Sequence, residues 1–258
     1  MSVPRPAAVI VLAAGEGTRM KSKTPKILHE LCGRTLVDHM LTAARGLEPE
    51  RLIVVIGHGR ERVGAHLALT SPDAQTVVQA EQRGTGHAVR TVLEEVGAVE
   101  GTVLVTYGDT PLLRTSTLAG LLERHAGEGN AVTVLTAEVP DPHGYGRIVR
   151  DGTGAVLEIV EEKDATAEQR AIREMNSGVY AFDGALLADA VKRVSTANVQ
   201  GRSTSPTSCR SCAGTVTGSA RTSRPTTSRS RASTTGSSWR SRARCSTPGC
   251  WRRTCGRA

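Results

Sequence analysis

Short apolar runs alternate with amphipathic stretches along the first half of the chain. The run at 7–14 is continuous and apolar, which is typical of a strand buried on both faces of a parallel sheet, and it ends in Gly15-Glu16-Gly17. The stretch that follows at 36–44 has apolar residues at helical spacing. Continued in this way, the pattern predicts strands at 7–14, 51–57, 74–78, 101–108 and 131–138, and helices at 36–44, 61–69, 86–96 and 116–126.

This alternation predicts an α/β fold, a doubly wound and mostly parallel sheet with helices on both faces. Beyond residue 140 the pattern changes to a hairpin-like region at 144–161, a strand at 178–182 and a helix at 184–194. In doubly wound sheets, ligands bind at the carboxyl ends of the strands. The Gly15–Gly17 turn and Asp109 both follow predicted strands, so we expect the chemistry of the chain to lie there.

The charge is divided unevenly along the 258 residues. A net charge of +8 would by itself suggest a nucleic-acid binder. However, residues 201–258 hold 12 Arg and no acidic residue, which leaves 21 basic and 25 acidic side chains in residues 1–200. We therefore predict a domain at 1–200 and a Ser/Thr/Arg-rich, low-complexity tail at 201–258. The tail has too few aliphatic residues to offset the entropy of ordering it, so we expect it to be disordered.

The chain shows no sign of a membrane or secreted protein. No apolar run approaches the roughly 20 residues that a membrane-spanning helix needs, and the N-terminus lacks a signal-peptide pattern. Residues 1–200 contain one cysteine, Cys32, which we expect to be a small buried apolar side chain. These features favour a cytoplasmic location with no membrane partner.

The first candidate motif is the string Leu12-Ala-Ala-Gly-Glu-Gly-Thr-Arg-Met20, followed by Pro25-Lys26. Glycines after a strand let backbone N–H groups approach a phosphate closely, and Arg19 and Lys26 would add positive charge for a triphosphate. The string is neither a Walker A loop nor the Rossmann glycine pattern. By itself, a turn with two glycines could equally serve tight packing.

Four further strings, at 79–88, 107–112, 144–147 and 176–178, extend the pattern. Together with the first motif, they resemble the sugar-1-phosphate nucleotidyltransferases. Within that family they are similar to the N-acetylglucosamine-1-phosphate uridyltransferase domain of bifunctional bacterial enzymes, from about residue 7 to residue 201. The resemblance implies a Rossmann-like nucleotidyltransferase fold and a Mg²⁺ cofactor. It also implies UTP and N-acetylglucosamine 1-phosphate as substrates, giving UDP-N-acetylglucosamine for peptidoglycan and cell-wall biogenesis, with no nucleic acid as partner.

The resemblance also implies roles for individual residues. Arg19 and Lys26 would act on the phosphates, and Asp109 would bind Mg²⁺. Glu161 would contact the sugar, although the adjacent Glu162 is an alternative. The nucleotide and the sugar would further be held by Leu12, Ala13, Ala14, Gly15, Gln79, Gly84, Thr85, Tyr107, Gly108, Gly146 and Asn176.

Each of these roles has a simpler alternative. Gln79 and Gln82 could be a solvated pair that precedes a helix. Asp109 could cap the next helix. We expect His58 to be structural, and His87 to pack at the start of a helix or to support the site from behind.

Three hypotheses could explain the tail at 201–258. Cys209 and Cys212 have C-x-x-C spacing, but no second such pair or nearby histidine supports a zinc or redox site. An Arg/Ser-rich RNA-binding segment is a second possibility. We favour a frameshift after about residue 201. Residues 204–208 and 231–238 can be back-translated so that one shifted frame gives Leu-Thr-Asp-Val and then Gly-Val-Asn-Asp-Arg-Val-Gln, two segments of the resembled family in order.

The frameshift has consequences for activity. The resembled family takes a second Mg²⁺ ligand from the Asn of that Gly-Val-Asn segment, and it forms trimer contacts through a C-terminal acetyltransferase domain. We expect all of these to be missing here, and therefore predict a chain that folds poorly or is nearly inactive. The rival hypotheses are another sugar-1-phosphate nucleotidyltransferase, an inactive frameshifted product and a nucleic-acid binder with a basic tail.

Overall fold

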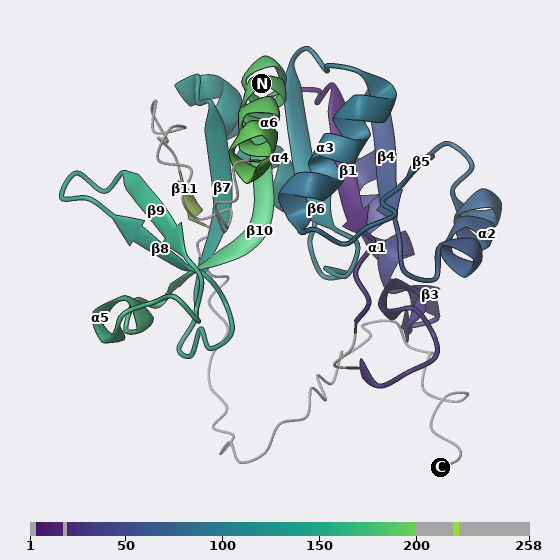
Figure 1. The fold of residues 1–258 in the computed structure, drawn as a ribbon, viewed down its shortest axis with the longest axis horizontal. Helices are drawn as coiled ribbons and strands as arrows, with labels where there is room; N and C mark the ends of the chain where they lie inside the picture. The colour runs from purple at the N-terminus through teal and green to yellow at the C-terminus, as the bar shows by residue number, and fades with distance from the viewer. Residues whose placement is uncertain (1–3, 18–19, 200–218, 222–258) are drawn as a thin grey trace. The chain divides into compact units, whose positions relative to one another are not determined.

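The computed structural model describes residues 4–17, 20–199 and 219–221, all within the compact unit Met1–Thr222. The predicted alternation of strands and helices is confirmed (Figure 1). The elements are, in order, β1 Ala8–Ala13, η2 Lys26–Leu28, β2 Glu30–Leu31, β3 Arg34–Thr35, α1 Leu36–Arg45, β4 Arg51–Ile56, α2 Arg60–Thr70, β5 Gln75–Val78, α3 Thr85–Val96, β6 Thr102–Tyr107, α4 Thr115–Glu128, β7 Val132–Glu138, β8 Arg147–Arg150, β9 Val156–Val160, α5 Ala167–Arg170, β10 Glu174–Asp183, α6 Gly184–Val199 and β11 Ser219–Arg221.

The main sheet of the described residues has two halves. Its strand order is β11-β7-β10-β6-β1-β4-β5, with β8 and β9 joined to it through β10. β5, β4, β1 and β6 are parallel. β10 is antiparallel to its neighbours β6, β7 and β8, and β8 and β9 form the predicted hairpin. The predicted α/β fold class is confirmed, with a mixed rather than uniformly parallel sheet.

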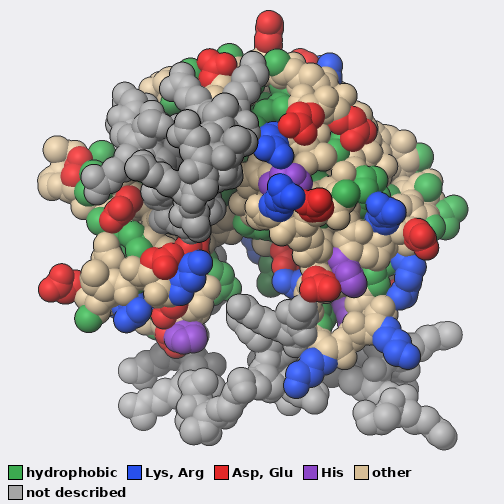
Figure 2. Space-filling model, in the orientation of Figure 1, with side chains coloured by type: hydrophobic (Ala, Val, Ile, Leu, Met, Phe, Trp, Pro, Cys, Tyr) green, Lys and Arg blue, Asp and Glu red, His purple; other side chains and the backbone are tan. Residues whose placement is uncertain are grey.

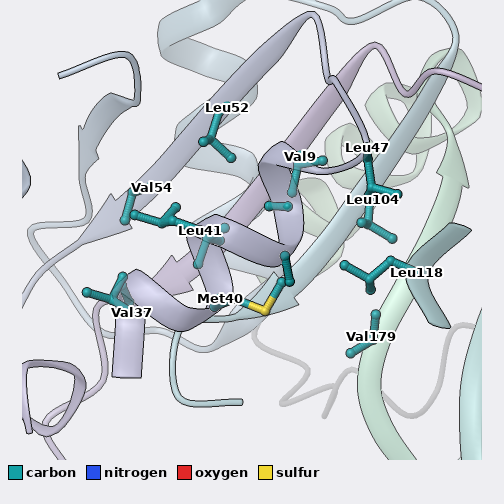
Figure 3. Close-up of a cluster of buried hydrophobic side chains, with 14 of the residues drawn as sticks. Val9, Val37, Met40, Leu41, Leu47, Leu52, Val54, Leu104, Leu118 and Val179 are labelled. Atoms are coloured by element: carbon teal, nitrogen blue, oxygen red, sulfur yellow. The ribbon is translucent and has the colours of Figure 1, made fainter. Parts of the chain in front are cut away.

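Helices cover both faces of the sheet, as predicted. Successive side chains of β1 point to opposite faces. Val9 and Val11 belong to one buried cluster, which includes Leu41 of α1 and Leu118 of α4 (Figure 3). Ile10 belongs to a second cluster, on the α3 and α6 side of the sheet. Because β1 is buried on both faces, its carboxyl end is held rigidly at the centre of the sheet.

The expectation that Cys32 is buried is wrong, since its side chain is exposed. Cys32 and Gly33 form the turn between β2 and β3, with φ angles of +52° and +77°. Two consecutive positive φ angles are typical of a tight hairpin turn, which projects its side chains away from the core.

Two strands differ from the prediction. β10 begins at Glu174 rather than at residue 178, because Glu174 is buried and accepts hydrogen bonds from Thr136 and Arg150. β11, which the sequence analysis placed in a disordered tail, pairs in parallel with β7. Without β11, β7 would be an edge strand with unpaired backbone groups. The rest of the predicted tail, including Cys209 and Cys212, lies outside the described residues, and the boundary near residue 200 stays a prediction.

Candidate functional site

The loop after β1 and the end of β6 meet through Lys26. Gly17 has a φ of +64°, and a Cβ on it would lie 2.6 Å from the Cβ of Lys26, so only glycine permits this close approach. The Lys26 ammonium forms an ion pair with Asp109, two residues after β6. Gly108 N–H donates to Leu12 O over 2.9 Å, which ties the two strand ends together. The structure therefore brings together five positions of the motifs that the sequence analysis had singled out.

Gly15 lies in open space on the same loop. A Cβ added to it would meet no heavy atom within 4 Å. The N–H groups of Gly15 and Glu16 donate no hydrogen bond to another described residue. Exposed amides without a hydrogen-bond partner among the described residues form a suitable environment for an anion. Arg19, the other predicted phosphate ligand, lies outside the described residues.

Gln79 follows β5 and is only 4% exposed, so it is not part of a solvated pair. Its Nε2 lies 3.3 Å from Gly84 O and 2.9 Å from His87 Nδ1. His87, in the first turn of α3, therefore contacts the side chain of a predicted base-binding residue. Gln82 is exposed, but its Nε2 donates to Ala14 O over 2.7 Å, so this glutamine also has a specific partner.

Three predicted sugar-binding residues lie together where β10 meets the β8–β9 hairpin. Asn176 N–H donates to Gly146 O over 2.8 Å. A Cβ on Gly146 would lie 3.5 Å from Glu161 Oε1 and 3.6 Å from Asn176 Cβ. The two strands pair through Met175 and Arg147, and this register sets Gly146 opposite Asn176.

The structure separates Glu161 from Glu162. Glu162 Oε2 pairs with the buried Arg147 guanidinium at 2.7 Å and accepts from Gly144 N–H at 3.3 Å. Burial raises the pKa of Glu162, but these two donors outweigh it and lower the pKa overall. Glu162 therefore stabilises the hairpin, whereas Glu161 has a carboxylate oxygen beside Gly146.

Tyr107, the last residue of β6, lies between the two groups of predicted residues. Its ring lies against Gly178 so closely that a Cβ there would overlap it. Burial raises the pKa of the Tyr107 hydroxyl, and the negative charges of Asp109 and Glu161 raise it further, against a hydrogen bond with Thr85. Asp109 of the parallel half and Glu161 of the hairpin thus both raise the pKa of the Tyr107 hydroxyl.

Asn176 is held by its own side-chain contacts. Its Oδ1 accepts from Gly178 N–H at 2.9 Å, and its Nδ2 donates to Tyr180 Oη at 2.7 Å. Burial raises the pKa of Tyr180 to about 12, so this hydroxyl stays protonated at neutral pH. These contacts fix the rotamer of Asn176 before any ligand binds.

A cavity of about 660 Å³ lies beside Gln79, at the carboxyl ends of β4 and β5. His58, for which the sequence analysis predicted a structural role, is half-exposed in the cavity wall, with Nδ1 3.8 Å from Glu16 Oε1. That role stays a prediction. The lining residues are Gly57, His58, Gly59, Arg60, Glu61, Arg62, Gln79, Ala80 and Gln82.

Among the described residues, a metal ion would find few protein ligands. The described residues hold no cluster of three or more His, Cys, Asp or Glu side chains placed for a metal. Mg²⁺ commonly uses one or two carboxylates together with phosphate oxygens and water. The partly exposed Asp109 carboxylate fits such a site, in which a bound triphosphate would complete the coordination.

Charge and hydropathy add two further observations. Acidic and basic side chains are interspersed over the described part of the face in Figure 2, without a large patch of one sign. Across the described residues, no helix has the length and the apolar character that crossing a bilayer requires.

Residues 9–178 match the family described as the MobA-like NTP transferase domain. The chain belongs to this family. It is also similar to curated proteins named bifunctional protein GlmU. The identity is 68% over 203 residues with the protein of Streptomyces avermitilis, 60% over 205 residues with that of Thermobifida fusca and 58% over 195 residues with that of Cutibacterium acnes. These matches cover 76–78% of this chain, which spans 42–46% of the length of those relatives.

Proposed function

We propose that this chain transfers a uridylyl group from UTP to N-acetylglucosamine 1-phosphate, giving UDP-N-acetylglucosamine and pyrophosphate. The observation that carries the proposal is the Lys26–Asp109 ion pair after β1 and β6, together with the grouping of Gly146, Glu161 and Asn176 where β10 meets the hairpin. The membership of the NTP transferase family and the similarity to GlmU proteins support it.

In this proposal, the nucleotide binds along the parallel half of the sheet. The amides of Gly15 and Glu16 donate to the triphosphate, and Lys26 and Arg19 balance its charge. Gln79 contacts the uracil from the side of α3. The remaining contacts to the nucleotide come from Leu12, Ala13, Ala14, Gly84, Thr85, Tyr107 and Gly108.

The sugar phosphate binds at the antiparallel half. The Glu161 carboxylate accepts from sugar hydroxyls, and the Asn176 amide contacts a hydroxyl or the acetamide. Gly146 leaves the space that the sugar ring needs, because a side chain there would contact both Glu161 and Asn176.

The reaction requires positioning and charge neutralisation rather than a protein nucleophile. A phosphate oxygen of the sugar phosphate attacks the α-phosphorus of UTP and forms the new P–O bond. The bond from that phosphorus to the bridging oxygen breaks, and pyrophosphate leaves with the electron pair. The attacking group is already anionic, so no general base is needed. Mg²⁺, held through Asp109, would supply charge neutralisation.

The proposal also covers the compartment in which the reaction takes place and the turnover of this chain. We place the reaction in the cytoplasm, since a single cysteine in residues 1–200 fits a reducing compartment. The frameshift would remove a second metal ligand of the resembled family, which predicts low turnover. The DNA around the Gly201 codon tests this directly. We expect one base to be inserted or deleted there relative to an open frame that encodes Leu-Thr-Asp-Val. The absence of such a change would contradict the frameshift.

A substrate panel tests the function itself. Pyrophosphate release by the full chain is measured with UTP, CTP, ATP and GTP, each with N-acetylglucosamine 1-phosphate or glucose 1-phosphate. We expect the pair UTP and N-acetylglucosamine 1-phosphate to give the highest kcat/KM. A higher value with glucose 1-phosphate or with another nucleotide would instead support another sugar-1-phosphate nucleotidyltransferase. A second preparation with the shifted frame restored after residue 201 should turn over at least about a hundredfold faster.

A further inference from the structure

We propose that His87 is a positioning residue for base selection. It holds the side-chain amide of Gln79 so that the Gln79 carbonyl oxygen, and not its NH₂ group, faces the nucleotide base. The site then accepts a base that donates a hydrogen, as uracil does at N3–H, and rejects one that presents a lone pair there, as cytosine does at N3. The inference rests on the proposed function for the identity of the nucleotide.

The orientation of the Gln79 amide follows from its neighbours. Gly84 O lies 3.3 Å from one terminal atom of Gln79. A carbonyl oxygen can only accept a hydrogen bond, so that terminal atom is the NH₂ nitrogen. Gly84 O itself is fixed, because it also accepts from Ala88 N–H at 3.2 Å in the first turn of α3.

His87 takes the second hydrogen of the same NH₂ group. Its Nδ1 lies 2.9 Å from Gln79 Nε2, and since the nitrogen donates, the imidazole nitrogen must accept. The ring proton of the neutral imidazole is then on Nε2. Both donors of Gln79 are thereby used inside the protein, and an amide flip would set its carbonyl oxygen against Gly84 O.

The Gln79 carbonyl oxygen is what remains for a ligand. Gln79 is 4% exposed and lines the cavity at the ends of β4 and β5. Its Oε1 accepts no hydrogen bond from another described residue. A base that donates to this buried oxygen gains a hydrogen bond. A base that presents a lone pair, as cytosine does at N3, leaves both that lone pair and the Gln79 oxygen without a hydrogen. Base discrimination therefore depends on His87, although His87 itself does not contact the base.

The test measures UTP and CTP binding to the full chain by calorimetry with Mg²⁺ present. We expect wild type to bind UTP at least a hundredfold more tightly than CTP. His87→Leu removes the acceptor and frees the amide to rotate, so UTP affinity should fall about tenfold and the UTP/CTP ratio should shrink at least tenfold. His87→Asn places an amide oxygen near the former Nδ1 position and should restore most of the ratio.

The matched control is Thr91→Ala, which removes the hydrogen bond from Thr91 Oγ1 to His87 O at 3.0 Å but leaves the contact with Gln79. It should leave the ratio unchanged. If His87 only packs at the helix start, His87→Leu weakens UTP and CTP equally, and that result overturns the inference. A preparation with the shifted frame restored after residue 201 that binds UTP selectively but does not transfer it overturns the proposed function alone, whereas such a preparation that binds no UTP overturns both.

Discussion

The two halves of the sheet position their candidate residues by different means. In the parallel half, Gln79 and Asp109 lie in loops after strands and Lys26 begins η2, and all three are fixed by side-chain contacts or a close glycine approach. In the antiparallel half, Asn176 lies on a strand and Gly146 directly precedes one, and the register of β10 with β8 brings them together. The candidate residues of the parallel half are thus joined by contacts between separate loops, whereas those of the antiparallel half are joined by the register of paired strands.

This difference decides what a substitution should do. A change in a loop residue of the parallel half should alter binding or turnover while the sheet persists. A change at a strand position of the antiparallel half should affect stability as well, because it alters a pairing between distant segments.

Asp109→Asn should have the largest effect, on the parallel side. Loss of the carboxylate charge should reduce turnover with Mg²⁺ by about a thousandfold, comparable to the loss of a strong electrostatic group in other active sites. The ion pair with Lys26 is partly exposed, so the melting temperature should change little. Steady-state kinetics and Mn²⁺ relaxation measurements with UTP check this. Unchanged Mn²⁺ binding in the variant would rule out Asp109 as a ligand.

Gly178→Ala should have the next largest effect, on the antiparallel side. The residue has a φ of +78°, and a Cβ would overlap the Tyr107 ring. Backbone strain and overpacking together should cost about 3 kcal/mol in the free energy of unfolding, measured in urea. Gly154→Ala is the matched control, with a φ of +87° and no atom within 4 Å of the added Cβ. Equal losses in both variants would mean that the Tyr107 contact contributes nothing.

Glu161→Gln should have an intermediate effect that separates the two neighbouring glutamates. We expect the KM for the sugar phosphate to rise about tenfold, because hydrogen bonds to a charged acceptor are lost. Glu162→Gln removes the ion pair with Arg147 and should lower the melting temperature while leaving that KM unchanged. The reverse pattern would assign the sugar contact to Glu162.

The smallest effect concerns α1 and α2, which support the parallel half. The Asp38 carboxylate accepts hydrogen bonds from His66 and Thr70, and the Thr35 hydroxyl, which accepts from Asp38 N–H, also interacts with it. Burial raises the pKa of Asp38, but these partners outweigh it and lower the pKa overall.

A carboxyl with a lowered pKa stabilises the fold when ionised. Its contribution is present above the unfolded value of about 3.9 and is lost as the pH falls through the lower folded value. Asp38→Asn should therefore cost under about 1 kcal/mol near neutral pH and reduce the loss of stability between about pH 5 and pH 2. Urea unfolding at several pH values measures this. Asp73→Asn, in a more exposed pair with Arg45, should give a smaller change.

The same contrast explains how far the sequence could predict the fold. The helical spacing of apolar residues and the continuous apolar runs are local signals. The strands and helices of the parallel half were therefore predicted to within a few residues. The insertion of β10 between β6 and β7 is a non-local pairing and leaves no periodic signal. The first residues of β10 are polar, and the hydrogen bonds of Glu174 with distant partners make them a strand.

For the site, motif spacing indicated candidate residues but not their partners. The contact between His87 and Gln79 depends on how the loop before α3 folds back, which the spacing of eight residues does not reveal. The adjacent glutamates at 161 and 162 are equivalent in sequence, and only the position of Arg147 distinguishes them. The roles of the individual site residues in catalysis and binding stay predictions.

The Lys26–Asp109 ion pair has a consequence for how the proposed substrate enters. The ammonium and the carboxylate neutralise each other, so together they form a dipole rather than a bare charge. Under the proposed function, binding would be an exchange of partners, in which the lysine turns to phosphate and the aspartate to the accompanying cation. Neither charge is left uncompensated at the start or at the end of that exchange.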